Sequence, residues 1–379
     1  MNEFSEPKRT PGDLKILLAG DIVLDADDPD HWLAGIAPAL RSADIAIGHL
    51  EVPHTHRGVE LTADVPATAP PPEHLDALLR AGITAVSLAG NHIADRGGEG
   101  IADTIERLDA LGIAHTGAGQ SIGAARVPAI VECRGRVAAL LSYNCVGPQA
   151  AWASESRAGC NYLLIHTADG SPVTPNAALT EPADEALATL RADIAAARQT
   201  ADIVIVALHK GIVHTPAKLA PYEQPIADAA LAAGAHVVVG HHAHILRGIE
   251  IRDDRCVFHG LGNGCVVTSA LSPDQDHPVR SQWALRRREL FGFEPDPDYP
   301  LAPFHPEAVH GALGVVLAFG DGRQATGVVP VFVEPPGRPV CVEDERADRV
   351  IAYIRRIGMQ AGLRDLHWQR STADLWMCS

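Results

Sequence analysis

Five nearly continuous apolar runs constrain the fold of this chain most strongly. They are LKILLAG (14–20), ADIAIGHLE (43–51), TAVSLAG (84–90), ADIVIVALH (201–209) and AHVVVG (235–240). Runs of this kind are typical of strands that are covered on both faces. Stretches of helical periodicity lie between them, at 72–82, 98–112, 184–199 and 222–234. The alternation of the two patterns predicts a mixed α/β fold.

Turn residues refine this prediction. Three of the expected helices run into a glycine, at positions 82, 112 and 234, as helices that end in a left-handed cap do. Residues 127–144 and 248–261 predict antiparallel hairpins, which turn at Arg134-Gly135 and Asp253-Asp254. The fold is therefore expected to contain antiparallel as well as parallel pairs of strands.

The chain is expected to form one large domain, residues 14–335, between a polar tail at 1–13 and a C-terminal helix and tail at 336–379. Within the domain, residues 266–310 are rich in Gly, Pro, His and aromatic residues and show no clear period. Loops of this length in a compact domain are usually functional or mobile. This segment is therefore a candidate lid, and the sequence does not predict whether it closes over the site.

The composition argues against several classes of protein. A net charge of −16 does not suit a nucleic-acid-binding surface. The seven cysteines form no C-x-x-C pair, so neither a disulfide framework nor a thiolate zinc site is expected. No segment has the apolar character of a signal peptide or a membrane span, so we expect a cytoplasmic protein without a membrane partner. The oligomeric state is not predicted.

Polar residues gather where the expected strands end. They are Asp21, His49, Glu51, Asn91, His92, Asp95, His209, His241, His242 and His244. One such histidine would most simply be a hydrogen-bonded core residue, but these positions follow all five strands. Because ligands bind at the carboxyl ends of strands in α/β sheets, we expect the side chains to meet in one crevice. Histidine nitrogens and carboxylate or amide oxygens are ligands for divalent ions, so the sequence predicts a metal site.

Six motifs carry a resemblance to a known family. They are Gly20-Asp21, HLE at 49–51, GNHIAD at 90–95, His209 with Gly211, GHHAH at 240–244 and GLGN at 260–263. In this order they resemble the CapA (poly-γ-glutamate capsule synthesis) branch of the calcineurin-like metallophosphoesterase superfamily. The resemblance covers residues 14–270 and, with HPE at 305–307 and the last hairpin, extends to 335. It implies a four-layer α/β/β/α fold whose domain 14–335 is catalytic.

The resemblance also implies roles for individual residues. It makes His92 the residue that handles protons, and it makes ligands of Asp21, Glu51, Asn91, His209, His242 and His244. The chain departs from the superfamily pattern in its first motif, where Asp-x-His is usual and Val23 stands in place of the histidine. It departs from the branch at three more positions: His49 where Asn is usual, Gly90 where Asn is usual, and Lys210 where Trp is usual.

These departures bear on the reaction. Phosphoester hydrolysis in this fold uses two ions, and the chain lacks a ligand for one of them. A single ion flanked by acid and base groups suits proton transfer better. One subgroup of the branch consists of metal-dependent epimerases that invert the C-terminal residue of a lasso-peptide precursor, a tryptophan in the described example, and this chain resembles that subgroup. The alternatives are a phosphoesterase or another hydrolase, a CapA-type enzyme of capsule polymers, and a non-catalytic binding protein.

The epimerase hypothesis needs two proton-transfer groups. His92 with Asp95 is one candidate pair, and Asp21 with His305 is the other. Six residues of the expected lid are candidates to hold a peptide carboxylate and an aromatic side chain, or to pack the lid: Arg280, Trp283, Arg286, Phe291, Phe293 and Tyr299. The partner would be the C-terminus of a precursor peptide. The ion would be Ca²⁺ if the chain is an epimerase, and Mn²⁺, Fe²⁺ or Zn²⁺ otherwise.

Overall fold

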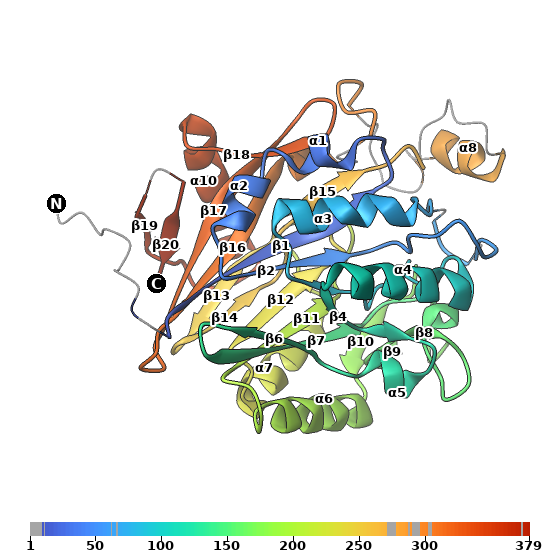
Figure 1. The fold of residues 1–379 in the computed structure, drawn as a ribbon, viewed down its shortest axis with the longest axis horizontal. Helices are drawn as coiled ribbons and strands as arrows, with labels where there is room; N and C mark the ends of the chain where they lie inside the picture. Colours follow the sequence, from blue (N-terminus) through green and yellow to red (C-terminus); the bar gives the residue numbers. More distant parts are fainter. Residues whose placement is uncertain are drawn as a thin grey trace.

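The computed structural model describes residues 10, 12–61, 63–65, 67–270, 278–286, 289, 296–301, 305–372 and 374–379. Two mixed β-sheets pack face to face, with helices on the outer face of each (Figure 1). This is the four-layer α/β/β/α arrangement that the resemblance implied. None of the helices in these ranges combines the length and the apolar character of a membrane span.

The larger sheet has ten strands in the described ranges, in the order β19-β20-β17-β16-β1-β2-β3-β4, with β15 paired to β1 and β18 paired to β17. Their bounds are β1 Leu14–Leu24, β2 Ile45–Leu50, β3 Ala85–Ser87, β4 Ala114–Thr116, β15 Asn263–Val267, β16 His310–Ala318, β17 Gln324–Glu334, β18 Arg338–Cys341, β19 Trp368–Arg370 and β20 Trp376–Cys378. β1, β2, β3, β4 and β15 are parallel, whereas β16 and the strands beyond it are antiparallel.

The second sheet has the order β13-β14-β12-β11-β7-β6. Its strands are β6 Ala129–Cys133, β7 Arg136–Asn144, β11 Ile203–His209, β12 Val237–His241, β13 Ile249–Arg252 and β14 Arg255–Phe258. Both predicted hairpins are confirmed as β6-β7 and β13-β14, and they turn at Arg134 and Asp253, whose φ angles are 52° and 54°. Two small pairs stand apart: β5 Ala118–Gly119 with β8 Gly159–Cys160, and β9 Ile165–Thr167 with β10 Leu179–Pro182.

The helices cover the two outer faces. Those on the larger sheet are α1 Pro29–Leu33, α2 Ala37–Arg41, η1 Pro72–Leu75, α3 Asp76–Ala81 and α4 Gly97–Leu111, and those on the second sheet are α6 Asp184–Ala197 and α7 Glu223–Ala233. The remaining helices are α5 Ile122–Ala125, η2 Gln149–Ala151, α8 Pro278–Leu285, η3 Pro306–Val309 and α10 Glu345–Gln360. The predicted helices are confirmed as η1 with α3, α4, α6 and α7, and α3, α4 and α7 are capped by the expected glycines.

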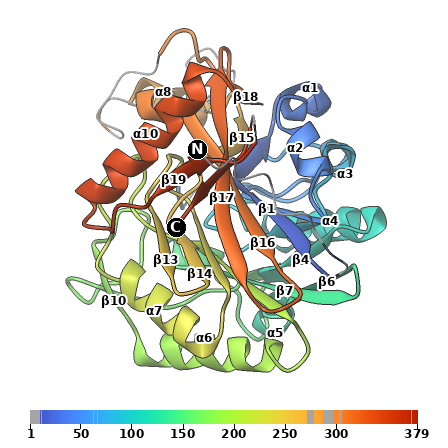
Figure 2. The ribbon, with the colours of Figure 1, turned by 90° about the vertical axis from the view of Figure 1, so that its left-hand side faces the viewer.

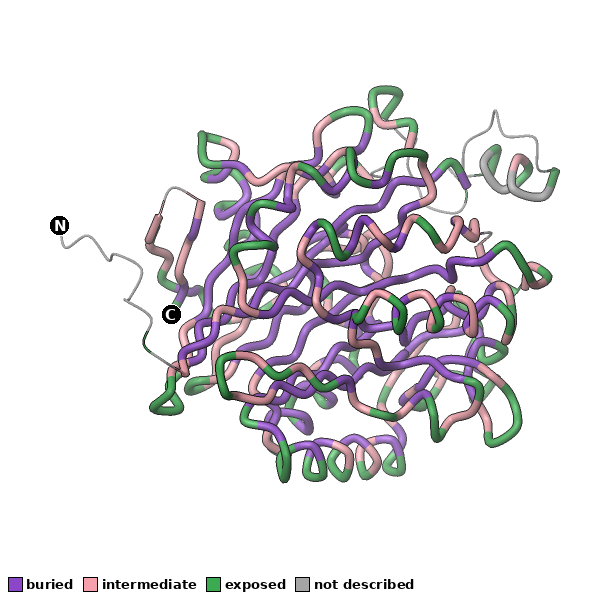
Figure 3. Tube along the Cα trace, in the orientation of Figure 1, coloured by how far each residue is buried: buried purple, intermediate pink, exposed green. Residues whose placement is uncertain are grey.

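Successive side chains along a strand point to opposite faces of the sheet, and this alternation creates three apolar layers. In β11, Ile203 and Ile205 point between the sheets, whereas Val204 and Val206 pack under α6 and α7. This is the period of two that a strand buried on both faces must show. Figure 3 shows the result, because the central strands are buried along most of their length and the exposed residues lie in helices and turns.

The C-terminal segment differs from the prediction. Residues 336–379 were expected to add a helix and a polar tail, but they extend the larger sheet with β18, β19 and β20. The predicted helix is present as α10, whose Val350, Ile354 and Ile357 join the layer between the sheets. Figure 2 views the molecule from the side that carries α10 and these strands. The segment is therefore part of the same core as residues 14–335.

A core substitution tests the layer between the sheets. Phe258 of β14 is fully buried there, and its ring lies under Gly314 of β16. Because Phe258→Ala leaves a cavity that two packed sheets cannot close, we expect the free energy of unfolding to fall by about 3–5 kcal/mol. Urea denaturation would measure it. Val127→Ala is the control, since Val127 is 60% exposed. That variant should change stability by less than about 0.5 kcal/mol, and equal losses in both would contradict the layered core.

Candidate metal centre and substrate cavity

The candidate site forms where strand ends from both sheets meet. Asp21 pairs in register with His49 of β2 on one side and with Asn263 of β15 on the other. The register of β1 shifts around Asp21, and such irregularities often reposition a side chain near a functional site. On the second sheet, His209 of β11 lies opposite His241 of β12. The strands thus present these side chains at one edge of the sandwich.

Asp21 connects the two sheets. Its carboxylate accepts hydrogen bonds from the backbone N–H of His242, at 3.3 and 3.2 Å. Its oxygens also lie 3.4 Å from His241 Nδ1 and 3.5 Å from His244 Nδ1. His242 and His244 have φ angles of 84° and 55°, which is unusual for residues other than glycine. Strained backbone of this kind gathers at functional sites, where the surrounding contacts hold it in place.

Two further groups complete the cluster. His244 Nε2 lies 3.2 Å from Glu51 Oε1, and His244 Nδ1 lies 2.9 Å from Asn263 Oδ1. His209 Nε2 lies 2.7 Å from Asn91 Oδ1, and its ring centroid is 4.7 Å from that of His242. The structure therefore brings all six predicted ligands into one cluster, in which their role as ligands stays a prediction.

His92 and Asp95 form the predicted pair. His92 Nδ1 lies 2.7 Å from Asp95 Oδ2, and Asp95 is almost fully buried. Burial by itself would lower the pKa of His92, but the charge of Asp95 outweighs it and raises that pKa to about 10. Burial raises the pKa of Asp95 to about 6, against the opposing effect of His92. The two groups therefore share a proton tightly, and the carboxylate orients the ring.

The other histidines of the cluster differ in the direction in which their pKa values are shifted. Burial would lower the pKa of His244, but the Glu51 carboxylate reverses this and raises it to about 9. Burial lowers the pKa of His49 and of His242 to about 3, and it lowers that of His209 well below its ordinary value. These three rings are neutral near pH 7, which is the form that binds metal ions.

Unsatisfied polar atoms test whether the residues fit a cation. Within the described part of the chain, Glu51 Oε2, His49 Nε2, His209 Nδ1 and His242 Nδ1 are buried without a hydrogen-bond partner. A buried polar atom left unpaired costs about 1–3 kcal/mol, so several in one cluster call for an explanation. A divalent ion would satisfy nitrogen and oxygen donors together. The residues present therefore fit the predicted metal.

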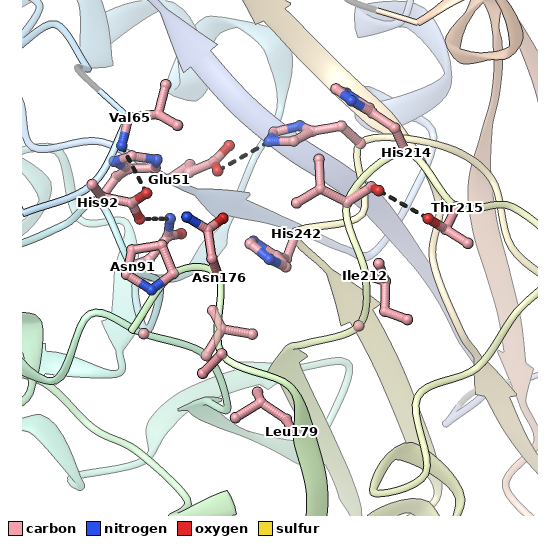
Figure 4. A pocket seen from close by; sticks show the side chains of 18 of the residues that line it. Glu51, Val65, Asn91, His92, Asn176, Leu179, Ile212, His214, Thr215 and His242 are labelled. Atoms are coloured by element: carbon pink, nitrogen blue, oxygen red, sulfur yellow. Dashed lines mark hydrogen bonds and ion pairs between the residues drawn. The ribbon is translucent and has the colours of Figure 1, made fainter. Parts of the chain in front are cut away.

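A cavity of about 710 Å³ opens from this cluster. Glu51, Asn91, His92, His242 and His244 line its inner part, and Figure 4 shows Glu51, Asn91 and His92 on one side with His214 across from them. The walls are mostly apolar and include Val23, Val52, Val146, Leu179, Ile212 and Val266. Among the described lining residues, Lys218 is the one Lys or Arg, whereas Glu51 and Asp64 are acidic.

Two residues of the site carried no role in the sequence prediction. Asp64 accepts a hydrogen bond of 2.7 Å from Asn91 Nδ2 and so orients that side chain. His214, with a φ angle of 52°, lines the cavity, and its ring centroid lies 6.2 Å from that of His244. Both come from irregular loops without a motif. The one signal for His214 in the sequence was that its loop directly follows the predicted residue His209, the last residue of β11.

The second predicted proton-transfer pair, Asp21 with His305, stays a prediction. His305 stacks on His214, with ring centroids 5.5 Å apart, and its Nδ1 accepts the backbone N–H of Glu307 at 3.1 Å. Asp21, its expected partner, contacts His241 at the end of β12 and His244 in the loop after it. His305 thus adjoins the cavity through His214, and Asp21 belongs to the ligand cluster.

The expected substrate-binding residues of the segment 266–310 are placed only in part. Phe291 and Phe293, and the side chains of Arg280 and Trp283, lie outside the described residues. Arg286 forms an exposed ion pair with Glu289 instead of reaching the cavity. The Tyr299 hydroxyl donates a hydrogen bond of 3.0 Å to the Val333 carbonyl of β17, so its ring packs on the larger sheet. The described part of this segment that lines the cavity is Val266, Thr268 and Ala270.

A buried ionic network holds one wall of the cavity. Glu223 Oε2 lies 2.5 Å from Lys210 Nζ, and Glu223 Oε1 lies 3.0 Å from Arg247 Nη1. All three side chains are almost fully buried. Glu223 also accepts the backbone N–H of Ala220 at 2.6 Å, and Arg247 donates to the Lys218 carbonyl. The network therefore fastens the loop 211–222, which lines the cavity, to the end of β11.

Comparisons with known proteins agree with this architecture. The model of the family described as bacterial capsule synthesis protein PGA_cap matches residues 15–266. The capsule biosynthesis protein CapA of Bacillus anthracis is 24% identical over 268 residues, which cover 66% of this chain and 59% of that protein. A probable polyglutamine synthesis accessory protein of Mycobacterium tuberculosis (strain CDC 1551 / Oshkosh) is 28% identical over 248 residues, covering 64% of this chain and 61% of the relative.

A third relative has no described activity. It is the uncharacterized protein y4sH of Sinorhizobium fredii, 26% identical over 310 residues that cover 65% of each chain. The chain therefore spans less than two thirds of the length of the curated relatives it matches.

The ionic network yields a stability prediction. Glu223→Gln leaves Lys210 and Arg247 buried beside a neutral amide, so we expect the free energy of unfolding to fall by about 3–5 kcal/mol, as when one partner of a buried pair is removed. Guanidinium denaturation and limited proteolysis within the loop 211–222 would measure it. The matched control is Glu345→Gln, which removes an exposed ion pair with Arg349 on α10. It should change neither quantity, and a Glu223→Gln variant as stable as this control would contradict the role given to the network.

Proposed function

The chain belongs to the bacterial capsule synthesis protein family PGA_cap, and within that family we propose that it is a metal-dependent peptide epimerase. The substrate would be the C-terminus of a lasso-peptide precursor, and the reaction would invert Cα of the last residue, with tryptophan as the first choice. Such a step belongs to the maturation of ribosomally made peptides. The observation that carries the proposal is the His92–Asp95 pair on the wall of a largely apolar cavity, beside the ligand cluster.

Inversion requires a base on one face of Cα and an acid on the other. His92, oriented by Asp95, would exchange a proton on the first face. On the opposite wall, His214 lines the cavity and His305 stacks on its ring. We assign the second proton transfer to this pair, with His214 nearest the substrate and His305 behind it. His92 lies in the loop after β3 of the larger sheet and His214 in the loop after β11 of the second sheet, so the two rings would approach one carbon from different sides.

A divalent ion held by Glu51 and His244, with Asn91 and His242 beside them, would supply positive charge next to the substrate carbonyl and lower the cost of removing the Cα proton. Oxygen donors from Glu51 and Asn91 favour Ca²⁺, whereas the imidazoles favour Mn²⁺, Fe²⁺ or Zn²⁺. His92 and His214 remain available as proton carriers because neither is needed as a ligand.

The walls of the cavity favour a substrate with an apolar side chain. Phosphoesters and polyglutamate are anionic, and they would meet Glu51 and Asp64 with Lys218 as the one Lys or Arg among the described lining residues. A peptide C-terminus carries one carboxylate, which Lys218 at the rim could pair with, while an indole ring would lie against Val146, Leu179 and Ile212. The balance of charge thus supports a peptide with an apolar end.

The comparisons favour a second candidate, an enzyme or accessory protein of capsule polymer synthesis. Two of the relatives are described by capsule biosynthesis or polyglutamine synthesis. A chain of this kind would act on, or bind, amide-linked glutamate polymers. This candidate requires that the ion offset the negative charge of the cavity, which is possible only if polymer carboxylates reach the ligand cluster directly.

A solvent-deuterium experiment tests the epimerase proposal. Metal-loaded protein in D₂O should place one deuterium at Cα of the last residue of a precursor peptide that ends in tryptophan. Starting from either epimer, it should reach the same ratio of L to D product, measured by mass spectrometry and chiral amino-acid analysis. His92→Ala and His214→Ala should each abolish inversion, and the deuterium content of each variant's product measures exchange on the face that keeps its histidine. Val127→Ala is the control. Absence of both exchange and inversion across peptides with varied apolar ends would exclude an epimerase.

A parallel assay addresses the alternatives. Because the cavity is acidic and apolar, we expect no release of phosphate from p-nitrophenyl phosphate and no shortening of poly-γ-glutamate with Ca²⁺, Mn²⁺ or Zn²⁺. Colorimetric phosphate release and size-exclusion chromatography would measure these outcomes. Turnover of about 1 per second or faster on either substrate, the ordinary enzymatic range, would place the hydrolase or capsule-polymer hypothesis ahead.

A further inference from the structure

We infer that Asn176 binds the last peptide bond of the substrate, with its Oδ1 atom accepting the N–H of the terminal residue. The inference rests on the proposed function, because it adds a recognition residue to the same cavity. Asn176 lines that cavity, and Figure 4 shows its side chain pointing into it, between Asn91 and His242 in this view. A residue with this role selects the end of a peptide chain as the ligand.

A tight turn holds Asn176 in this position. The Ala177 N–H donates a hydrogen bond of 3.1 Å to the Thr174 carbonyl, so residues 174–177 form a β-turn in the connection between β9 and β10. Pro175 is the second residue of this turn and Asn176 the third. Proline presets the φ angle of the second position, and asparagine is one of the residues that turns favour. The carboxamide is therefore presented by a backbone with little freedom.

The turn also packs against the chain that follows β7. The Gln149 N–H donates a hydrogen bond of 3.1 Å to the carbonyl of Val173, which is buried. Gly147 allows the two segments to approach each other closely, since a Cβ atom there would clash with the Thr174 carbonyl carbon. The position of Asn176 relative to the cavity is thus set before a ligand arrives, which lowers the entropic cost of binding.

The Asn176 carboxamide is available to a ligand. Within the described part of the chain, its side chain forms no hydrogen bond. The other asparagine of the cavity is engaged at both ends, because Asn91 Nδ2 donates to Asp64 and Asn91 Oδ1 lies 2.7 Å from His209 Nε2. Asn176 keeps an acceptor oxygen and two N–H donors. A peptide group, which offers both an N–H and a carbonyl, matches a side chain of this kind.

Thr68 is the competing candidate for this role. It also lines the cavity, and its Oγ1 atom is buried without a hydrogen-bond partner among the described residues. Because this oxygen is closed to solvent, an incoming peptide would have to displace the surrounding chain to reach it. Asn176 is exposed on its turn and needs no such movement. The geometry therefore favours Asn176.

A hydrogen bond to the N–H completes the hold on Cα. Besides its hydrogen, Cα carries a side chain, a carboxylate and the amide nitrogen. In the proposed complex the side chain lies on the apolar wall, the carboxylate pairs with Lys218, and Asn176 holds the amide. These three substituents become coplanar with Cα as the proton leaves, and holding all of them fixes the plane whose two faces turn toward His92 and His214. Inversion requires such a fixed plane, because the proton leaves from one face and returns on the other.

Two matched peptides test the inference by binding alone. Both end in tryptophan, and one carries an ester in place of the last amide, which removes the N–H. Calorimetry with the full chain loaded with Ca²⁺ would give each Kd. Wild-type protein should bind the amide at least about tenfold more tightly than the ester, because the ester leaves Asn176 Oδ1 without its partner. Asn176→Ala should bind both peptides equally, whereas Asn176→Asp, which keeps an acceptor oxygen, should keep the preference.

Two further variants serve as controls. Ser171→Ala changes an exposed residue of the same connection that does not line the cavity, and Thr68→Val removes the competing hydroxyl with little change of shape. Both should keep the wild-type preference. The inference is overturned if wild-type protein binds neither peptide or binds both equally, if Asn176→Ala keeps the preference, or if Thr68→Val loses it.

Inversion assays on the same peptides separate this inference from the proposed function. A preference for the amide without inversion would remove the epimerase and leave peptide recognition by Asn176. Inversion by a wild-type protein that binds amide and ester equally would leave the epimerase and remove the role of Asn176.

Discussion

The Asp21 carboxylate is the interaction on which the site depends. It is a buried charge, and removing such a charge from water costs several kcal/mol unless close partners compensate. The compensating groups are the N–H of His242 and the rings of His241 and His244, which come from the last residue of β12 and the loop after it on the second sheet. Satisfying Asp21 therefore fixes how the two sheets meet at this edge. It also holds His242 and His244 in their positive φ conformations, with their rings directed at the cluster.

The sequence predicts the parts of the fold and of the site that depend on local patterns. It does not predict the parts that depend on contacts between distant residues. Strands and helices follow from periodicity and caps, and ligands at strand ends follow from the geometry of parallel strands. The positions of Asp64 and His214 depend on irregular loops, whose paths are set by contacts with distant residues such as Asn91 and Glu223. The pairing of Asp21 with His305 stays a prediction, because which loop faces a strand end depends on how two sheets pack. β19 and β20 were missed because three-residue strands show too little alternation to recognise.

A buried ionic network holds the opposite wall of the cavity in place. Lys210 follows His209 directly, and its burial against Glu223 connects the end of β11 to the start of α7. Glu223 in turn holds the backbone of Ala220, so the path of the loop 211–222 is set at both of its ends. His214 lies on that loop. A proton-transfer residue must stay within hydrogen-bond reach of one carbon, and a loop fixed at both ends by buried charges meets that demand better than a free one. The lysine at position 210, a departure from the family pattern, therefore has a physical reason in the placement of His214.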